Sequence, residues 1–464
     1  MPDLEAVYRK LPVAFQHAAC SVAGWRVENG RLGGDFPRLL ADAEARSFWA
    51  RDEVRAFRDA RLRAFIRHCF ENVPFYRLRF EEARIDPDAI AGLDDLVGLP
   101  LLTKDEARER VSELAANGSP RHERKIVHTS GTTGGGLRFA TSLRAIREQW
   151  AVWWRYRHWH GIRRGTWCAH FAGRSIVPAE QQHPPFWRYN FPGSQILFSG
   201  YHMSPQNLPS YVEELRRRRL PWIHGYPSLL ALLAGHVLQS GAELGYRVKW
   251  VTTGAENLLP QQSQLIRRAF GIRPVQHYGM AEAVANISEC ERGALHVDED
   301  FAAVEFLPRG SGTYAVVGTN FTNPLTPLVR YEVGDLVTLE PDRECGCGRS
   351  GRVVARVDGR REDYVVLKDG TRVGRMDHVF KDLVNVREAQ IRQQQPGELT
   401  IRLVRLPAYD EADERELLRE TAKRLGDDTQ VRLEYVERLE RSATGKLRFV
   451  VSELPEGALE QPLS

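Results

Sequence analysis

A nine-residue stretch at positions 128–136, HTSGTTGGG, contains four hydroxyl side chains and four glycines. Glycines let the backbone approach a polyphosphate closely, while backbone amides and hydroxyl groups donate hydrogen bonds to its oxygens. A β-branched run precedes the stretch and an aromatic helical pattern follows it as far as Trp159, which predicts the strand, loop, helix order of a nucleotide-binding turn. It is not a Walker loop, because Leu137 and Arg138 stand where that motif requires lysine and then serine or threonine.

The composition is that of an ordinary globular chain, and its 464 residues suffice for about three or four packed units. Hydrophobic residues make up 42% and charged residues 27%, which argues against a disordered or fibrous protein. The 65 basic and 61 acidic residues leave a net charge of +4, so charge does not favour nucleic acid as a partner. No apolar run approaches the ~18 residues that a membrane span needs and no secretory signal is visible, so we predict a cytoplasmic protein without a membrane partner.

Changes in pattern along the chain divide it into regions of different secondary structure. Residues 1–100 are dominated by helix-forming runs, whereas strand-like and helical runs alternate over 165–290. Short alternating runs at 295–338 predict a smaller β-rich unit, and a later shift in pattern begins a small α+β domain. We therefore predict an α/β fold with a large N-terminal domain over 1–358, made of several subdomains, and a C-terminal domain over 359–464.

Five further motifs follow the hydroxyl-rich loop in the order found in one enzyme superfamily. They lie at 254–256 (GAE), 278–282 (YGMAE), 330–335 (RYEVGD), 359–363 (GRRED) and 442–446 (SATGK). Together with residues 129–134 they resemble the motifs of the adenylate-forming enzymes, which activate carboxylic acids as acyl-adenylates with ATP. The HGYPS segment at 224–228 and the cysteine pattern described below resemble, more narrowly, the phenylacetate-CoA ligases and their capsule-biosynthesis relatives.

The resemblance implies a nucleotide site assembled from positions spread over two thirds of the chain. The hydroxyl-rich loop would hold the phosphates, the turn at 254–256 would contact adenine, and Asp335 would accept hydrogen bonds from the ribose hydroxyls. The residues placed against the nucleotide are Thr129, Ser130, Gly131, Thr132, Thr133, Gly134, Gly254, Ala255, Glu256, Tyr278, Gly279 and Asp335.

Three residues are expected to act on the reacting groups, because adenylation brings a carboxylate onto the α-phosphate while negative charge builds up. The resemblance makes Glu282 the ligand of Mg²⁺ and places Arg360 near ribose and phosphate. It also places Lys446 on a loop that brings one ammonium group to the reacting carboxylate. Only eight of the 65 basic residues are lysine, so a lysine here suggests that a compact charge is needed. Glu362 stands at the expected hinge, which would make the C-terminal domain mobile.

Two positions depart from the family pattern. Ala281 stands where a threonine usually precedes the metal-binding glutamate, and it removes a hydroxyl that relatives aim at the phosphate. The hinge contains Glu362 where an aspartate pair is more typical. Ala281 leaves the adenylation geometry open and could indicate a slow or specialised enzyme.

Four soft residues have the composition of a structural zinc site. Cys345 and Cys347 lie one residue apart on a glycine turn, and Cys290 and His296 lie six residues apart upstream. Three cysteines and one histidine make a closed tetrahedral zinc set, although the spacing is not that of a zinc finger. Free thiols or a redox pair remain alternatives. Similar positions occur in zinc-containing phenylacetate-CoA ligase relatives, so the resemblance favours a zinc ion that clamps the nucleotide site from below.

The acyl pocket is less clearly marked than the nucleotide site. Residues 150–201 are rich in aromatic side chains, which would suit a flat acid, yet Trp150, Trp153 and Trp154 have helical spacing that favours the core. Residues beside the nucleotide motifs are better pocket candidates, and their polarity suggests an acid that carries a hydroxyl or amino group. We therefore expect a small aromatic or polar-substituted acid. These residues are His224, Tyr226, Ser228 and His277.

The resemblance leads to one main functional hypothesis and two alternatives. The main hypothesis is a ligase that makes an acyl-AMP, releases pyrophosphate and transfers the acyl group to the thiol of coenzyme A or a carrier protein. The first alternative transfers the acyl group to an amine and forms an amide. The second is a non-catalytic, zinc-stabilised binding protein, against which the presence of Glu282, Asp335 and Lys446 argues. A homodimer is left open, because the sequence does not fix the oligomeric state.

Overall fold

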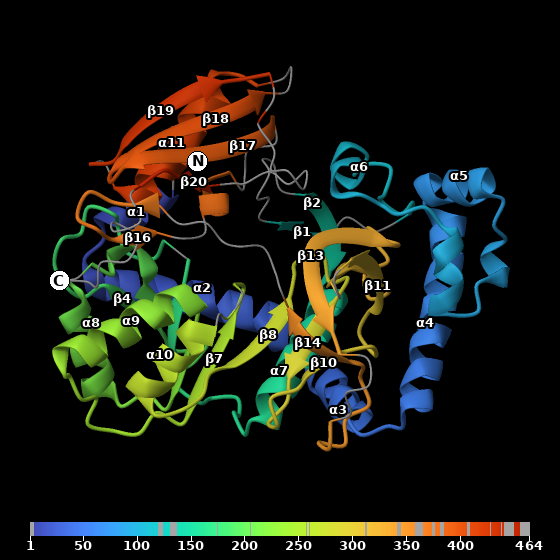
Figure 1. The fold of residues 1–464 in the computed structure, drawn as a ribbon, viewed down its shortest axis with the longest axis horizontal. Coiled ribbons are helices and arrows are strands. Elements are labelled where there is room, and N and C mark those ends of the chain that lie inside the picture. Colours follow the sequence, from blue (N-terminus) through green and yellow to red (C-terminus); the bar gives the residue numbers. More distant parts are fainter. Residues whose placement is uncertain are drawn as a thin grey trace.

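The computed structural model of the chain has one large α/β layer structure with a small C-terminal domain above it (Figure 1). The residues that it describes are 4–118, 124–129, 137–173, 175–204, 206–256, 258, 260–310, 313–340, 345–357, 365–373, 376–380, 385–405, 409–426, 428–437, 439 and 450–454. Within these residues, no helix is both long enough and apolar enough to cross a membrane.

The first hundred residues are helical, as the sequence predicts. The long helices α2 and α4 are joined and followed by shorter ones, and α4 and α5 pack together at one end of the molecule (Figure 1). The elements are α1 (Leu4–Lys10), α2 (Val13–Leu32), α3 (Phe36–Arg46), α4 (Arg51–Asn72), α5 (Pro74–Ala83), η1 (Pro87–Ala89), η2 (Leu93–Gly98) and α6 (Lys104–Glu109).

A twelve-stranded sheet forms the centre of the molecule, in the order β11-β12-β13-β14-β10-β9-β8-β7-β6-β3-β5-β4. The five strands from β8 to β5 in this order are parallel, and the remaining neighbours are antiparallel. The first half of the strands in chain order are β3 (Cys168–Ala172), β4 (Trp187–Asn190), β5 (Gln195–Ser199), β6 (Trp222–Gly225), β7 (Trp250–Gly254) and β8 (Val275–Gly279). The other six are β9 (Asn286–Glu289), β10 (Leu295–Val297), β11 (Ala303–Gly310), β12 (Thr313–Thr319), β13 (Tyr331–Leu339) and β14 (Val353–Val357).

The predicted β-rich unit at 295–338 is present, but it is not a separate sheet. Strands β11 to β13 continue the central sheet through β14 and β10, so the parallel and antiparallel halves share one hydrogen-bonded layer. The sequence pattern changes at this point because the antiparallel strands are joined by short turns, whereas parallel strands need helical crossovers.

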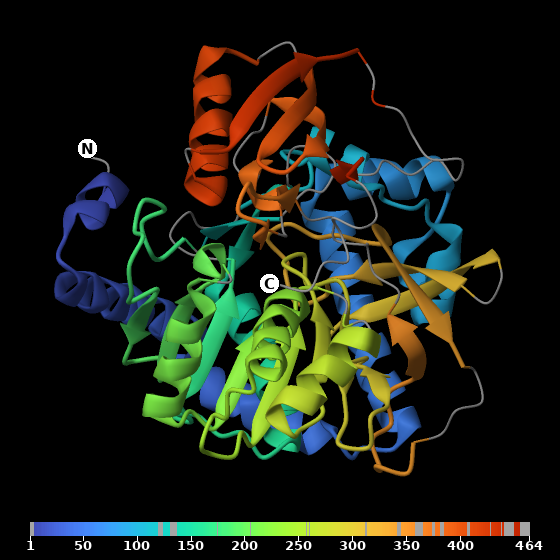
Figure 2. The same cartoon turned by 60° about the vertical axis from the view of Figure 1, so that its left-hand side comes forward.

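Helices cover the parallel half of the sheet on both sides (Figures 1 and 2). On one face α8 (Leu208–Arg218), α9 (Pro227–Ser240) and α10 (Pro260–Phe270) bury alternate strand residues such as Ala169, Phe171 and Ile223. On the other face α2 and α7 (Leu143–Trp159) meet the intervening residues, among them Cys168 and Trp222. Because side chains alternate along a strand, His170 and His224 belong to this second face.

The hydroxyl-rich loop differs in one respect from the prediction. It joins β1 (Arg124–His128) to β2 (Arg138–Ser142), which pair antiparallel as a hairpin, and α7 begins only after β2. The order is therefore strand, loop, strand, helix. The alternating burial of residues 138–142 marks β2 as a strand, and Ser142 caps the helix by accepting a hydrogen bond from the Ala145 amide at 3.0 Å.

The C-terminal domain is a small α+β unit, as predicted, and residues 358–364, which contain the predicted boundary and hinge, lie outside the described part of the chain. Its four-stranded sheet has the order β19-β18-β17-β20, and α11 packs against it. The elements are β15 (Val365–Val366), β16 (Arg372–Val373), η5 (Met376–Phe380), β17 (Val386–Gln395), β18 (Glu398–Arg405), α11 (Glu411–Leu425), β19 (Gln430–Tyr435) and β20 (Val450–Ser452).

Candidate active site

Three of the predicted motifs meet at one edge of the sheet. Strands β6, β7 and β8 are parallel neighbours, and their carboxyl ends carry Tyr226, the 254–256 turn and the segment after Tyr278. Ligands of open parallel sheets bind at this edge, because the loops that follow the strands converge there. Ala255 has a φ of 67°, which is unusual for a residue other than glycine and marks a sharply turned backbone.

A hydrogen bond joins two motifs that are distant in the sequence. The Tyr278 hydroxyl donates to Asp335 Oδ2 at 2.9 Å, which connects the end of β8 with β13. Asp335 is half-buried, so one carboxylate oxygen is engaged by Tyr278 and the carboxylate remains within reach of a ligand. The pairing brings the 278–282 motif and the predicted ribose-binding segment to one place.

Glu282 lies in the loop between β8 and β9 and is 8% exposed. The Asn320 side chain donates to the Glu282 backbone carbonyl at 3.1 Å, which fixes the backbone at this position. The next residue, Ala283, has a φ of 57°, so the chain turns sharply here. A carboxylate fixed in this way is a suitable hard oxygen donor for Mg²⁺. Ala281 offers only a methyl group at the adjacent position.

The two residues that flank the hydroxyl-rich loop are hydrogen-bonded to each other. Thr129 and Leu137 share a backbone hydrogen bond of 2.9 Å, and the Leu137 amide also donates to Thr129 Oγ1 at 2.8 Å. Thr129 is therefore turned inward as the anchor of the loop. The other predicted phosphate-loop residues, Ser130, Gly131, Thr132, Thr133 and Gly134, lie outside the described residues, as do Arg360 and Lys446.

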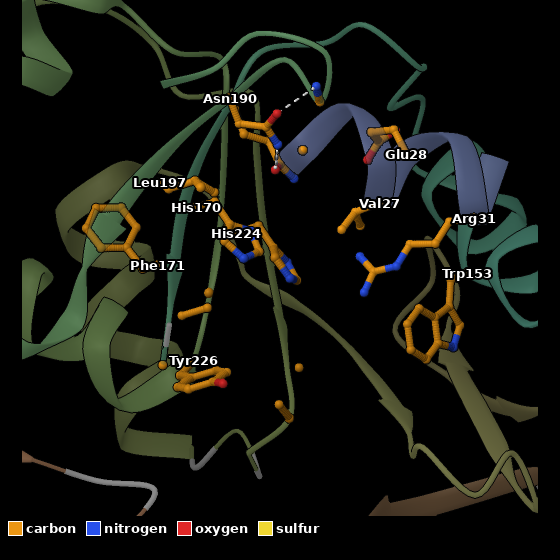
Figure 3. Close-up of a pocket in the computed structure, with 18 of the residues that line it drawn as sticks. Val27, Glu28, Arg31, Trp153, His170, Phe171, Asn190, Leu197, His224 and Tyr226 are labelled. Atoms are coloured by element: carbon orange, nitrogen blue, oxygen red, sulfur yellow. Dashed lines mark hydrogen bonds between the residues drawn. The ribbon is translucent and has the colours of Figure 1, made fainter. Parts of the chain in front are cut away.

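A cavity of about 1110 Å³ runs from this edge along the face of the sheet that α2 and α7 cover (Figure 3). Its near end is lined by Tyr226, Gly254, Ala255 and Gly279. Its far end reaches Asn190 and the residues at which the parallel strands begin. The cavity thus joins the predicted nucleotide segments to the predicted acyl pocket, and it exceeds the space that a nucleotide motif alone would need.

Residues 365–453 match the family described as the CapK C-terminal domain. Protein CapK of Staphylococcus aureus is 24% identical over 463 residues, which cover 97% of this chain and all of that protein. Phenylacetate-coenzyme A ligases of Thermus thermophilus and Escherichia coli are each 25% identical, over 68% of this chain and 73% of theirs. A solved 2-hydroxyisobutyryl-CoA ligase with 2-HIB-AMP and CoA has the same fold, with a TM-score of 0.55 and 20% identity over 89% of this chain and 92% of that chain.

In agreement with the resemblance found in its motifs, the chain is similar to CapK over most of its length and to the phenylacetate-CoA ligases over about two thirds of it. The family match at 365–453 lies in the C-terminal part of the chain.

Two histidines that the sequence placed in the acyl pocket do line the cavity. Nδ1 of His224 lies 2.8 Å from Thr252 Oγ1, and Nε2 of His277 lies 2.8 Å from Asn286 Oδ1. Burial, with further repulsion from His170 and Arg157, lowers the pKa of His224 well below its ordinary value. Burial also lowers the pKa of His277 to about 4. Both rings are therefore neutral at physiological pH. Tyr226 is also in the cavity wall, whereas the Ser228 side chain lies outside the described part.

A buried hydrogen-bond chain fixes the orientation of His277. Asp298 receives the Arg155 guanidinium at 2.6 Å and also accepts from the Asn286 amide nitrogen. The Asn286 oxygen then faces the cavity side, where it accepts from Trp153 Nε1 at 2.9 Å. Because a carbonyl oxygen only accepts, His277 must carry its proton on Nε2, which leaves Nδ1 as an acceptor. Asn286 can approach this closely because Gly279 has no Cβ, which would lie 2.7 Å from Asn286 Oδ1.

The tryptophans on α7 are not simply core residues. Trp150, Trp153 and Trp154 all line the cavity, although Trp154 also belongs to the buried core. The interpretation that favoured the core is wrong for Trp153, whose ring lies 5.2 Å from that of His277. The far end of the cavity also contains charged residues that were not predicted from the sequence, namely Glu28, Arg31, Arg157 and Arg164. Arg157 follows Trp153 and Trp154 at helical spacing, and that was the available signal.

The C-terminal domain forms one wall of the cavity mouth. Arg419, Glu420 and Lys423 of α11 line the opening together with Val379 of η5. Arg424 Nη1 donates to the Tyr201 hydroxyl at 2.6 Å, and Tyr201 in turn donates to the Gly173 carbonyl. The two domains are therefore joined by hydrogen bonds beside the cavity.

The four predicted zinc ligands lie together. Their ligand atoms are all within 4.8 Å of one another, with Cys290 Sγ 3.7 Å from Cys345 Sγ and Cys347 Sγ 3.3 Å from His296 Nε2. Two thiolates bound to one tetrahedral zinc ion at ~2.3 Å are ~3.8 Å apart, so the spacing fits the ion. The Gly351 carbonyl lies 3.2 Å from His296 Nδ1 and directs Nε2 toward the thiols, as an outer partner of a metal ligand does.

Proposed function

We propose that this protein activates a carboxylic acid with ATP, releases pyrophosphate, and transfers the acyl group of the resulting acyl-AMP to a thiol. The observation that supports the proposal is that Gly254, Ala255 and Gly279 line one end of a deep cavity. Tyr278, the residue before Gly279, donates a hydrogen bond to Asp335. A site of this kind serves adenylation because it holds a nucleotide beside a pocket for the acid. The named CoA ligases among its relatives support the same reaction.

In the first step a carboxylate oxygen forms a bond with the α-phosphorus, and the bond to the pyrophosphate group breaks. Thr129 and residues 130–134 would hold the phosphates, Glu282 would hold Mg²⁺, and Asp335 would hold the ribose. Mg²⁺, when bound, supplies charge neutralisation at the phosphates. Lys446 and Arg360 would add cationic stabilisation at the reacting carboxylate and the α-phosphate.

In the second step a thiol attacks the acyl carbonyl and AMP leaves with the bonding electrons. Coenzyme A is the first choice of acceptor, because the named phenylacetate and 2-hydroxyisobutyryl relatives are CoA ligases. A carrier-protein thiol offers the same chemistry. The neutral His224 and His277 and the Trp153 ring suit an acid with an aromatic or polar-substituted body.

We also propose that Cys290, His296, Cys345 and Cys347 bind a structural zinc ion. The site would join the segment after β9 and the His296 position on β10 to the segment before β14. No reacting group needs to reach it, because all four ligand positions are filled by the chain.

Carboxylate-dependent exchange of labelled pyrophosphate into ATP, measured over a panel of acids, tests the activity. We expect exchange with at least one acid, and a loss of about 100-fold or more in Lys446→Ala, because a removed transition-state cation has an effect of this size. Lys249→Ala is the matched control, since Lys249 is exposed and stacks on Trp250 away from the cavity.

Absence of exchange with every acid would overturn the proposal, and so would equal activity of Lys446→Ala and the control. Mass analysis of products with coenzyme A, pantetheine and a set of amines then separates thioester formation from amide formation. An amide as the only product would replace the second step while leaving the first intact.

A further inference from the structure

Three arginines from two neighbouring segments line the far end of the cavity. Arg31 comes from α2, Arg157 from α7 and Arg164 from the turn after α7, and Glu28 is the acidic residue among them. Three guanidinium groups and one carboxylate leave a formal charge of +2 in this part of the cavity. A pocket built only for an apolar acid body would not place this charge at its end.

Aromatic rings hold two of these cations in place. The Arg157 guanidinium lies over Trp154 at 4.9 Å and over Trp150 and Trp222 at 5.5 Å from each centroid. Arg31 lies over Trp150 at 4.3 Å, and Figure 3 shows it reaching from α2 into the space between Val27 and Trp153. Stacking uses the face of a guanidinium group, so the N–H edge of Arg157 is available to a planar anion.

The Arg157 guanidinium has no hydrogen bond or ion pair with any acceptor in the part of the chain that the structure describes. A partly buried cation without an anionic partner is unfavourable, and burial accordingly lowers the pKa of Arg157. Glu28 relieves this only in part, since it acts to raise the pKa of Arg157 but forms no ion pair within 4 Å with it. An anionic ligand group would supply the missing partner.

The cationic end is remote from the edge where the reaction takes place. Cys168 pairs with Trp222 at the start of β3 and β6, and Phe171 pairs with Gly225 next to Tyr226 at their ends. The four steps from residue 222 to residue 226 span ~13 Å at the rise of a β-strand. An acid that reaches both ends must therefore be longer than a single ring with a one-carbon arm.

We propose that the acid activated by this protein carries a second anionic group, a carboxylate or a phosphate, which Arg157 and Arg31 bind at the far end of the cavity. This inference rests on the adenylation activity proposed above and names the class of its substrate. The neutral His224 and His277 and the tryptophan rings would contact the body of the acid between its two charged ends. The reverse arrangement, a cationic far end bound by Glu28, is opposed by the three surrounding guanidinium groups.

The test compares acids of one length that differ only at the far end. Pyrophosphate exchange is measured with a dicarboxylic acid, its mono-amide, its amino analogue and the corresponding phosphate ester. We expect kcat/KM for the dicarboxylic acid or the phosphate ester to exceed that of the mono-amide by ~10- to 100-fold, the usual effect of a hydrogen bond to a charged group. Whichever of the two anions gives the higher value identifies the far group.

Arg157→Gln and, separately, Arg31→Gln should reduce this ratio toward one, and Arg157→Lys should retain part of it. Arg144→Gln is the matched control, because Arg144 is on the same helix but pairs with Asp35 at the surface, 3.0 Å away. Preference for the mono-amide or the amino analogue, or an unchanged ratio in both glutamine variants, would overturn the inference while exchange itself continues. Loss of exchange with all acids in the unmodified protein would instead contradict the proposed activity.

Discussion

His277 shows how one buried side chain connects the stability of the fold to the pocket. In the unfolded chain its imidazole binds a proton below about pH 6.5, whereas burial keeps the folded form neutral down to about pH 4. Between these pH values the unfolded state binds more protons, so the free energy of unfolding falls as the pH falls. The slope from one such group is at most about 1.4 kcal/mol per pH unit.

We therefore expect His277→Gln to flatten the loss of stability between pH 6.5 and 4 relative to the unmodified protein. Glutamine keeps a donor for Asn286 but does not titrate. Chemical denaturation at a series of pH values measures the slope, and His183→Gln, at an exposed position, is the control. Parallel slopes for the three proteins would show that the His277 ring is not neutral in the fold.

The residues of the nucleotide edge were more predictable than those of the far pocket. Tyr278, Glu282 and Asp335 belong to short motifs that can be recognised in the sequence by their order and spacing. The structure brings Tyr278 and Asp335 into contact. Arg31 and Arg157 belong to no motif, because α2 and α7 meet only through tertiary packing. Without the fold, their helical positions are those of ordinary surface arginines.

At the scale of elements, we predict a zinc ion that joins the segment after β9 to the segment before β14. Metal analysis should find about one zinc ion per chain, since three cysteines and one histidine form a complete ligand set. Cys347→Ser, or removal of the metal with a chelator, should lower Tm by about 2 to 3 °C, the effect of losing about 2 kcal/mol in a chain of this length.

Cys20→Ser is the control for this experiment, because Cys20 lies on α2 outside the cluster. If the chelator changes neither metal content nor Tm, or if Cys347→Ser retains zinc, the four residues are free thiols and an ordinary histidine.

The helices and strands that could be predicted from the sequence are those whose formation depends on a local residue pattern. The helix over 260–270 and the helical runs before residue 100 are confirmed, because their apolar periodicity and proline or glycine boundaries are local signals. Strand β2 was missed because its five residues follow the glycine-rich loop and merge into the α7 pattern. Its pairing with β1 cannot be read from the local sequence pattern. The continuity of the twelve-stranded sheet was also beyond the sequence, since hydrogen bonds between β14 and β10 join segments about sixty residues apart.

At the scale of the whole molecule, we make a further prediction from the hydrogen bonds of Tyr201 between the two domains. Tyr201→Phe removes the hydroxyl that receives Arg424 and binds the Gly173 carbonyl, so this docked arrangement should lose about 1 to 3 kcal/mol. We expect one of the two half-reactions to slow by about tenfold and the other to change little, because a mobile domain uses different poses for different steps.

Separate measurement of pyrophosphate exchange and thioester formation tests this expectation. Tyr435→Phe is the control, since Tyr435 lies in the same domain but bonds to Glu414 at its surface. Equal slowing of both half-reactions, or of neither, would mean that the Tyr201 contact does not distinguish the poses.

Because residues of α11 line one side of the cavity, the C-terminal domain forms part of the pocket wall. The hydrogen bond from Arg424 to Tyr201 lies in this wall, so the shape of the cavity depends on the position of the domain. For the activity proposed above, we expect the rates of acid binding and release to depend on this position as well as on the affinity of the pocket.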